Sequence, residues 1–126
     1  MPESIGLHKI GQIAVPVHDI ERAVKFYRET LGMKFLFQAG NLAFFDCDGV
    51  RLLLDVPETK EFDHPSSVIY FTVPDIQATV KTLKERHVEI VAEPHMIAKM
   101  DTYDLWMAFF KDPDNNVHAV MAEVKR

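Results

Sequence analysis

One phrase occurs twice in the sequence, and this repeat limits the possible folds more than any other feature. Residues 13–27 read IAVPVHDIERAVKFY and residues 69–83 read IYFTVPDIQATVKTL, with Asp19 and Asp75 at equivalent places 56 positions apart. Each copy begins with apolar residues at alternate positions, as a strand does, and then changes to helical spacing. Each Asp stands where a helix needs an N-cap, because its carboxylate can accept hydrogen bonds from first-turn N–H groups. The repeat therefore predicts two modules of the same design.

The remainder of each copy predicts three further strands. In the first copy the helix is expected to end at Gly32, and short alternating segments separated by turn residues follow. The elements expected in the first copy are strands at 13–17, 34–38, 42–45 and 50–55 and a helix over 20–31. Those expected in the second are strands at 67–73, 88–92, 104–110 and 116–124 and a helix over 76–86. We predict one α+β domain of two tandem βαβββ modules, at about residues 8–56 and 67–124, joined by a linker over 57–66.

The two copies differ most between their second and third strands. The first has only a tight turn at Ala39-Gly40, whereas the second has residues 93–103, EPHMIAKMDTY. We interpret this segment as a long loop, which is typical of a lid or pocket wall. The alternative is that it only spans a wider gap between strands.

Composition narrows the classes of function. The chain has a formal net charge of −5 and no basic cluster, which argues against a nucleic-acid partner. No apolar run approaches the roughly 20 residues that a membrane helix needs, and the first ten residues do not resemble a secretory signal. The single cysteine, Cys47, excludes an intrachain disulfide and fits a reducing compartment. We expect a cytoplasmic protein with a small-molecule ligand and neither a membrane nor a nucleic-acid partner.

The repeat, the phrase AVKFYRETLGM at 23–33 and the turn DPDNN at 112–116 together resemble the vicinal oxygen chelate superfamily. Its members include glyoxalase I, bleomycin and fosfomycin resistance proteins, extradiol dioxygenases and methylmalonyl-CoA epimerase. The resemblance extends from Ile10 to Val124 and implies that each module curls its sheet, with two such sheets facing each other around a pocket. It also implies a homodimer, with the pocket formed within one chain or across two.

The resemblance implies four metal-ligand positions on the concave faces of the sheets in relatives that bind a metal. Here these positions hold Gln12, Leu53, Val68 and Ala119, of which only Gln12 carries a donor atom. A slip of one residue in the last strand would place His118 at the fourth position instead. We predict no cofactor. A divalent metal is the alternative, with Gln12 and His118 as its expected ligands.

Five residues are candidates for the pocket. His95 lies among methionines, where an imidazole can serve as an acid or base, so His95 and Gln12 are the catalytic candidates; alternatively, His95 bonds its own backbone. Tyr70 and Trp106 each combine an apolar ring with a polar tip, as pocket residues do, but either ring can also belong to the core. His118 fits either a pocket or a buried interface. The pocket candidates are Gln12, Tyr70, His95, Trp106 and His118.

Two functions remain open from the sequence. The first is a metal-free binding protein of the bleomycin-resistance type, which holds a small, largely apolar or flat molecule. The second is a metal-dependent lyase, isomerase or dioxygenase of the glyoxalase I type. Whether the chain is an enzyme stays open, because the superfamily places many reactions on one scaffold.

Overall fold

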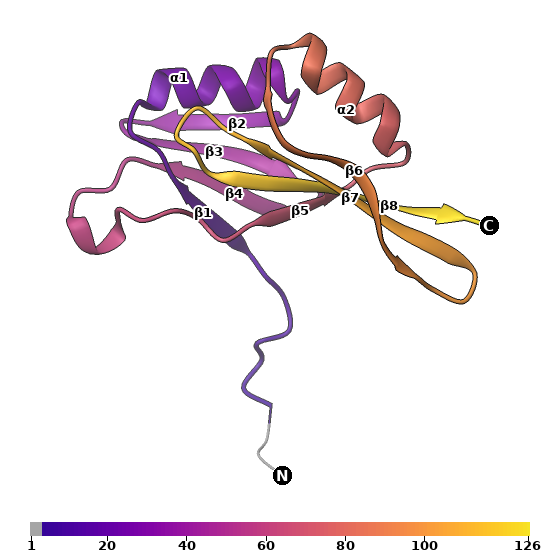
Figure 1. Cartoon of the computed structure of the whole chain (residues 1–126). Coiled ribbons are helices and arrows are strands. Elements are labelled where there is room, and N and C mark those ends of the chain that lie inside the picture. The colour runs from indigo at the N-terminus through magenta and orange to yellow at the C-terminus, as the bar shows by residue number, and fades with distance from the viewer. Residues whose placement is uncertain (1–3) are drawn as a thin grey trace.

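The computed structural model describes residues 4–126 and contains two βαβββ units in sequence (Figure 1). The first unit comprises β1 (Gln12–Pro16), α1 (Ile20–Lys25), which continues as the π-helical turn η1 (Phe26–Thr30), β2 (Lys34–Ala39), β3 (Leu42–Cys47) and β4 (Val50–Asp55). The second comprises β5 (Ile69–Thr72), α2 (Ile76–Glu85), β6 (Glu89–Lys99), β7 (Tyr103–Lys111) and β8 (Val117–Lys125), and the 3-10 turn η2 (Lys60–Phe62) lies between the units. The predicted fold class is confirmed.

Both helices begin at the aspartates that the repeat singled out. Asp19 Oδ1 accepts a hydrogen bond from Arg22 N at 3.1 Å, and Asp75 Oδ1 accepts one from Ala78 N at 3.1 Å. Both aspartates have extended backbones, with φ of −132° and −138°, as N-cap residues do. The predicted N-caps are therefore confirmed.

Each unit forms a four-stranded mixed sheet with a helix on one face. The strand orders are β1-β4-β3-β2 and β5-β8-β7-β6, with β1 parallel to β4 and β5 parallel to β8. Figure 1 shows α1 and α2 on the same side of the molecule, above the strands. We call the opposite face of each sheet its helix-free face. That these two faces enclose a pocket stays a prediction.

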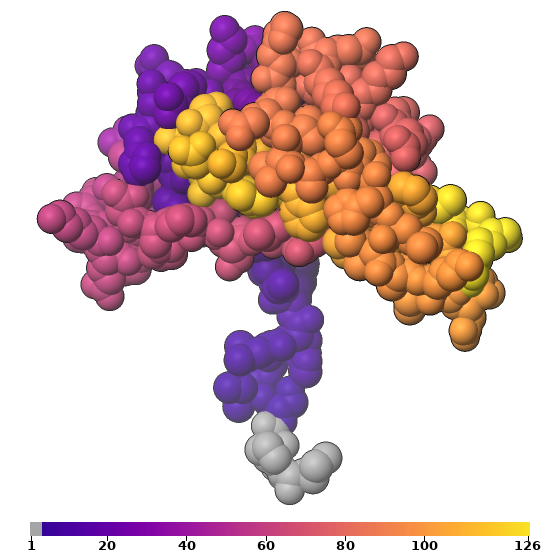
Figure 2. Space-filling view, viewed as in Figure 1, coloured from indigo at the N-terminus to yellow at the C-terminus, as the bar shows by residue number. Residues whose placement is uncertain are grey.

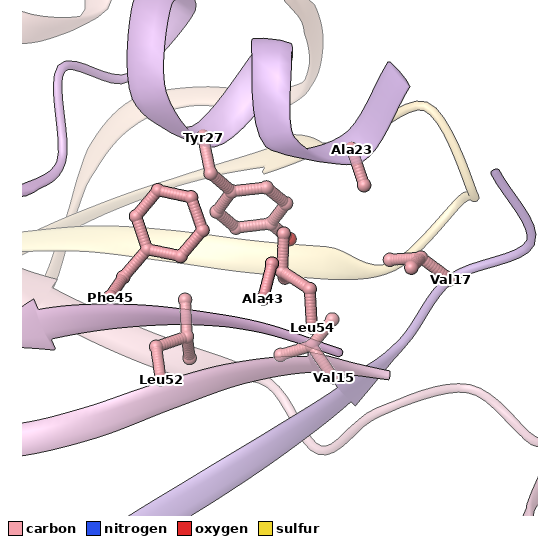
Figure 3. Close-up of a cluster of buried hydrophobic side chains, with 8 residues drawn as sticks. All are labelled: Val15, Val17, Ala23, Tyr27, Ala43, Phe45, Leu52 and Leu54. Carbon is pink, nitrogen blue, oxygen red and sulfur yellow. The ribbon is translucent and has the colours of Figure 1, made fainter. Parts of the chain in front are cut away.

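Two apolar clusters lie between the helices and the sheets. The cluster under α1 consists of Val15, Val17, Ala23, Tyr27, Ala43, Phe45, Leu52 and Leu54 (Figure 3). The cluster under α2 consists of Ile76, Val80, Leu83, Val88, Ala108, Phe110, Val120 and Ala122. Ile69 of β5 packs against the first cluster, and Phe26 and Leu31 pack against both. The two units therefore share part of their core, to which Ile69 of β5 contributes from the second sheet.

The predicted loop over 93–103 is wrong. β6 continues to Lys99 and β7 begins at Tyr103, so these strands form a long hairpin with only a short turn between them. Three register shifts along β6 break the alternation of apolar and polar residues, which hid the strand in the sequence. Pro94 is tolerated because β6 is an edge strand, where a missing N–H costs no interior ladder bond.

The N-terminal segment extends away from the body of the molecule (Figure 2). Three of its apolar side chains are largely exposed: Ile5 at 85%, Leu7 at 86% and Ile10 at 62%. Within residues 4–126, no helix combines the length and apolar character needed to cross a bilayer.

Candidate functional site

The helix-free face of the first sheet carries two parallel rows of side chains. Residues directly opposite each other on neighbouring strands point to the same face, so the strand register defines each row. The polar row is Gln12, Arg51, Asp46 and Lys34, taken from β1 to β2. The apolar row, two residues further along β1 and β4, is Ala14, Leu53, Phe44 and Phe37.

A bulge in β2 supplies the outermost member of the apolar row. The register shifts between Phe35 and Phe37, so Phe35 lies opposite Phe45 whereas Phe37 lies opposite Phe44. Phe35 thereby packs against the core under α1, and Phe37 turns to the helix-free face. Phe37 stacks on Phe44 with ring centroids 4.4 Å apart and an interplanar angle of 24°, yet it remains 49% exposed. This stack leaves an aromatic surface open to solvent.

Arg51 connects the polar row to the aromatic stack. Its guanidinium carbon lies 5.6 Å from the centroid of the Phe44 ring, within the range of a cation–π contact. The side chain is exposed, and it takes part in none of the ion pairs found within residues 4–126. The guanidinium N–H donors are therefore available to a ligand.

The second sheet has a comparable surface. Its first row is Tyr70, Ala119, Phe109 and Ala92, and its second is Thr72, Met121, Met107 and His95. Tyr70 and Phe109 meet edge to face, with centroids 6.0 Å apart, on either side of the buried Ala119. Tyr70 is 46% exposed. The second helix-free face is therefore also rich in apolar and aromatic atoms.

Three of the five predicted pocket residues belong to these rows. Gln12 lies on the first face, and Tyr70 and His95 lie on the second. The exposed His95 places Nδ1 2.7 Å from the carbonyl oxygen of Glu93, which can only accept, so Nδ1 carries the proton. This backbone contact is the alternative that the sequence offers for His95, and it leaves Nε2 without a partner among the hydrogen bonds of residues 4–126. The catalytic roles of Gln12 and His95 stay predictions.

The structure places Trp106 and His118 on the opposite side of the second sheet from Tyr70 and His95, and this corrects their expected position. Trp106 lies opposite Ala122 and packs against the cluster under α2. His118 is fully buried next to Ala119, and neighbouring residues in a strand point to opposite faces. Neither side chain belongs to the rows of the helix-free faces.

His118 instead takes part in a buried polar network between the two units. Tyr27 Oη lies 2.7 Å from Asp112 Oδ2 and 2.7 Å from His118 Nε2. A carboxylate can only accept, so the single hydroxyl proton is donated to Asp112 and the hydroxyl accepts from His118 Nε2–H. His118 Nδ1 has no hydrogen-bond partner within residues 4–126. This is the pattern of a neutral imidazole.

Burial sets the protonation of this network. Desolvation lowers the pKa of His118, against the opposing effect of the nearby Asp112 charge. Desolvation and the same carboxylate raise the pKa of Tyr27 far above its ordinary value. Asp112 is held by donors on both oxygens, from Asp114 N, Asn116 N, Asn116 Nδ2 and Tyr27 Oη. Sequence reasoning missed Tyr27 and Asp112 as partners, although both lie in the two segments that carried the family resemblance.

The residues present do not fit the four-ligand metal centre that the resemblance implies. Strand pairing fixes how the last strands of the two units correspond. Ala14 and Tyr70 occupy equivalent positions in the repeat, 56 residues apart, and they lie opposite Leu53 and Ala119. Leu53 and Ala119 are therefore equivalent positions. The possible slip that would have put His118 in place of Ala119 is thereby removed. Leu53 and Ala119 offer only carbon atoms, and Gln12 remains the single donor. No group of three His, Cys, Asp or Glu residues within 4–126 is arranged to hold an ion.

Comparisons with known proteins identify the family. A family model described as the Glyoxalase/Bleomycin resistance protein/Dioxygenase superfamily matches residues 9–120. The chain belongs to this superfamily. The family resemblance seen in the sequence is thus confirmed, and it covers both βαβββ units of this superfamily member.

Two curated relatives are similar over most of their length. A glyoxylase-like domain-containing protein of Didymella fabae is 26% identical over 121 residues, which cover 89% of this chain and 91% of the relative. The metallothiol transferase FosB of Lysinibacillus sphaericus (strain C3-41) is 26% identical over 115 residues, which cover 87% of this chain and 79% of the relative.

Solved structures of the superfamily share the fold. A member from Sphaerobacter thermophilus DSM 20745 superimposes with a TM-score of 0.78 at 25% identity, covering 93% of this chain and 98% of that one. Lactoylglutathione lyase from Agrobacterium tumefaciens gives a TM-score of 0.72 at 19% identity, covering 91% and 93%. The second likeness concerns the fold alone.

Proposed function

We propose that this superfamily member is a metal-free binding protein for a small, flat and largely apolar molecule, which it holds on the helix-free faces of its sheets. The observation that carries the proposal is the pair of open aromatic groups, Phe37 on Phe44 and Tyr70 with Phe109. Exposed aromatic rings next to a few polar groups are what a pocket for such a ligand requires. The carbon-only side chains at Leu53 and Ala119 support binding by shape over metal coordination.

The proposal is tested with 2-naphthol, an uncharged flat probe. We expect saturable binding, with amide chemical-shift changes in NMR spectra at the apolar row of the first sheet. Phe44→Ala should weaken binding about fivefold, since an aromatic pair contributes about 1 kcal/mol. Met100→Ala serves as the control, because Met100 is an apolar side chain that is 42% exposed but lies in the turn between β6 and β7, outside both rows. Absence of saturable binding, or an equal loss in both variants, would contradict the proposal.

A second function is supported by one comparison. The relative from Lysinibacillus sphaericus is named a metallothiol transferase, so a metal-dependent enzyme is the competing proposal. In that case Gln12 and His95 would be the groups to test, with a metal at a site displaced from the positions of Leu53 and Ala119. Mass-spectrometric metal analysis of the purified protein, before and after chelation, separates the two functions. A stoichiometric transition metal that survives purification would favour the enzyme.

We also propose that the protein works as a homodimer in the cytoplasm. The three exposed apolar side chains of the N-terminal segment, Ile5, Leu7 and Ile10, support a partner surface. Analytical ultracentrifugation across a range of concentrations tests the dimer, and a monomer at all concentrations would contradict it. The cytoplasmic location stays a prediction from the sequence.

A further inference from the structure

We propose that the ligand is an anion: a carboxylate carried on a flat ring, with the carboxylate bound by Arg51 and the ring lying against Phe44 and Phe37. This inference rests on the proposed function and names the ligand class for the same face. It is carried by the position of one guanidinium at the boundary between the polar and apolar rows.

The surroundings of Arg51 suit a carboxylate. A guanidinium presents paired N–H donors that match the two oxygens of a carboxylate, and the Phe44 ring 5.6 Å away supports its plane. Gln12 lies directly opposite Arg51 on the neighbouring parallel strand, about 5 Å away between backbones, and its amide offers a further N–H donor. Two donors of different strands thus point to the same place on the helix-free face.

The charges on the helix-free face of the first sheet favour an anion beside the polar row and not beyond the apolar row. The polar row contains the cations Arg51 and Lys34 and one anion, Asp46, so it has a net positive charge in a chain of net charge −5. Asp46 Oδ1 accepts a hydrogen bond from Gly49 N at 3.1 Å, and Asp46 forms no ion pair with Arg51. On the other side of the apolar row, the ionisable group is a carboxylate, because Asp55 lies there opposite Leu42. A ligand carboxylate is therefore expected at the Arg51 end, with its ring directed toward Leu53 and Phe44.

The chain contains a matched control for Arg51. Arg28 also places its guanidinium over a phenylalanine ring, 4.9 Å from the centroid of Phe35, but Phe35 packs against the cluster on the helix side. Arg28→Gln therefore removes the same kind of charge and the same kind of ring contact without touching the helix-free face. Both arginines are exposed, so circular dichroism of both variants should match that of the unsubstituted protein.

The experiment compares 2-naphthoate with 2-naphthol by isothermal titration calorimetry. We expect the unsubstituted protein and Arg28→Gln to bind the carboxylate about tenfold more tightly than the alcohol, and Arg51→Gln to bind both equally. Arg51→Lys should keep part of the preference, because it retains the charge but loses the paired donors. Equal binding of the two probes by the unsubstituted protein, or a preference that survives in Arg51→Gln, would overturn this inference while leaving the proposed function standing. Failure of both probes to bind would overturn both.

Discussion

The buried network between the two units gives the sharpest test of the structure. In Tyr27→Phe, Asp112 Oδ2 loses one donor but keeps Asn116 Nδ2 at 2.9 Å. His118 loses the only partner of its ring, since Nδ1 already has none within residues 4–126. The lost hydrogen bond to a carboxylate costs about 1.5–3 kcal/mol, and an orphaned buried imidazole about 1–3 kcal/mol more. We therefore expect the free energy of unfolding to fall by about 2.5–6 kcal/mol.

The measurement is equilibrium unfolding in guanidinium chloride at pH 7.5, where a change in midpoint at constant slope reports stability. Tyr103→Phe is the control, because Tyr103 is a half-buried tyrosine at the start of β7 that takes no part in the network. The double variant Tyr27→Phe with His118→Leu should lose less unfolding free energy than the two single variants lose together, since it leaves no orphaned imidazole. A loss below about 0.5 kcal/mol in Tyr27→Phe, or full additivity in the double variant, would refute the reasoning.

Three further outcomes are expected. Burial lowers the pKa of His118 below the ordinary 6.5, so the unfolded state binds the proton more readily. Stability should therefore decline as the pH falls below 6.5. His118→Leu should lose this decline, which is measured by unfolding between pH 7.5 and 5. The pKa of the exposed His18 is raised above 6.5 by its hydrogen bond to Asp63 at 2.7 Å. The contribution of this pair to stability is therefore present below pH 6.5 and disappears as the pH rises through the raised pKa. A dependence of stability on pH that is unchanged in His18→Gln would contradict this. Asp75→Ala removes the N-cap of α2 and should cost about 1 kcal/mol in the same assay, whereas Asp75→Asn should retain most of the stability.

The repeated phrase was sufficient to predict much of the fold. Its alternating and helical periods reflect local packing against a single core, and its aspartates cap the helices through contacts three residues away. These features are local, so they can be predicted from the sequence. The strand β6 could not be predicted over its full length, because its pairing with β7 tolerates three register shifts and a proline within an edge strand.

The candidate site was predictable only in part, because the facing of a side chain depends on register. Gln12 and Tyr70 belong to β1 and β5, in which apolar residues alternate regularly, and both lie on the helix-free faces, opposite the apolar residues of those strands. His118 and Ala119 are neighbours, so a one-residue uncertainty decided which of them faced the helices. Trp106 follows the same rule, since its orientation depends on its pairing with Ala122 across the β7–β8 turn. Tyr27 and Asp112 meet across 85 residues, a contact that no local pattern encodes.

The distribution of polar groups between the two sides of the molecule bears on whether the site does chemistry. The tyrosine, carboxylate and imidazole that meet at hydrogen-bond distance are buried on the helix side, where they join the two units. On the helix-free faces, Gln12 is on β1, whereas His95 is on β6, three strands beyond β5. At about 4.8 Å per strand, the backbone of His95 lies roughly 14 Å across the sheet from β5, the strand that carries Tyr70. The groups that meet at hydrogen-bond distance are thus turned away from the proposed ligand face, whereas His95 stands at the outer edge of the second sheet.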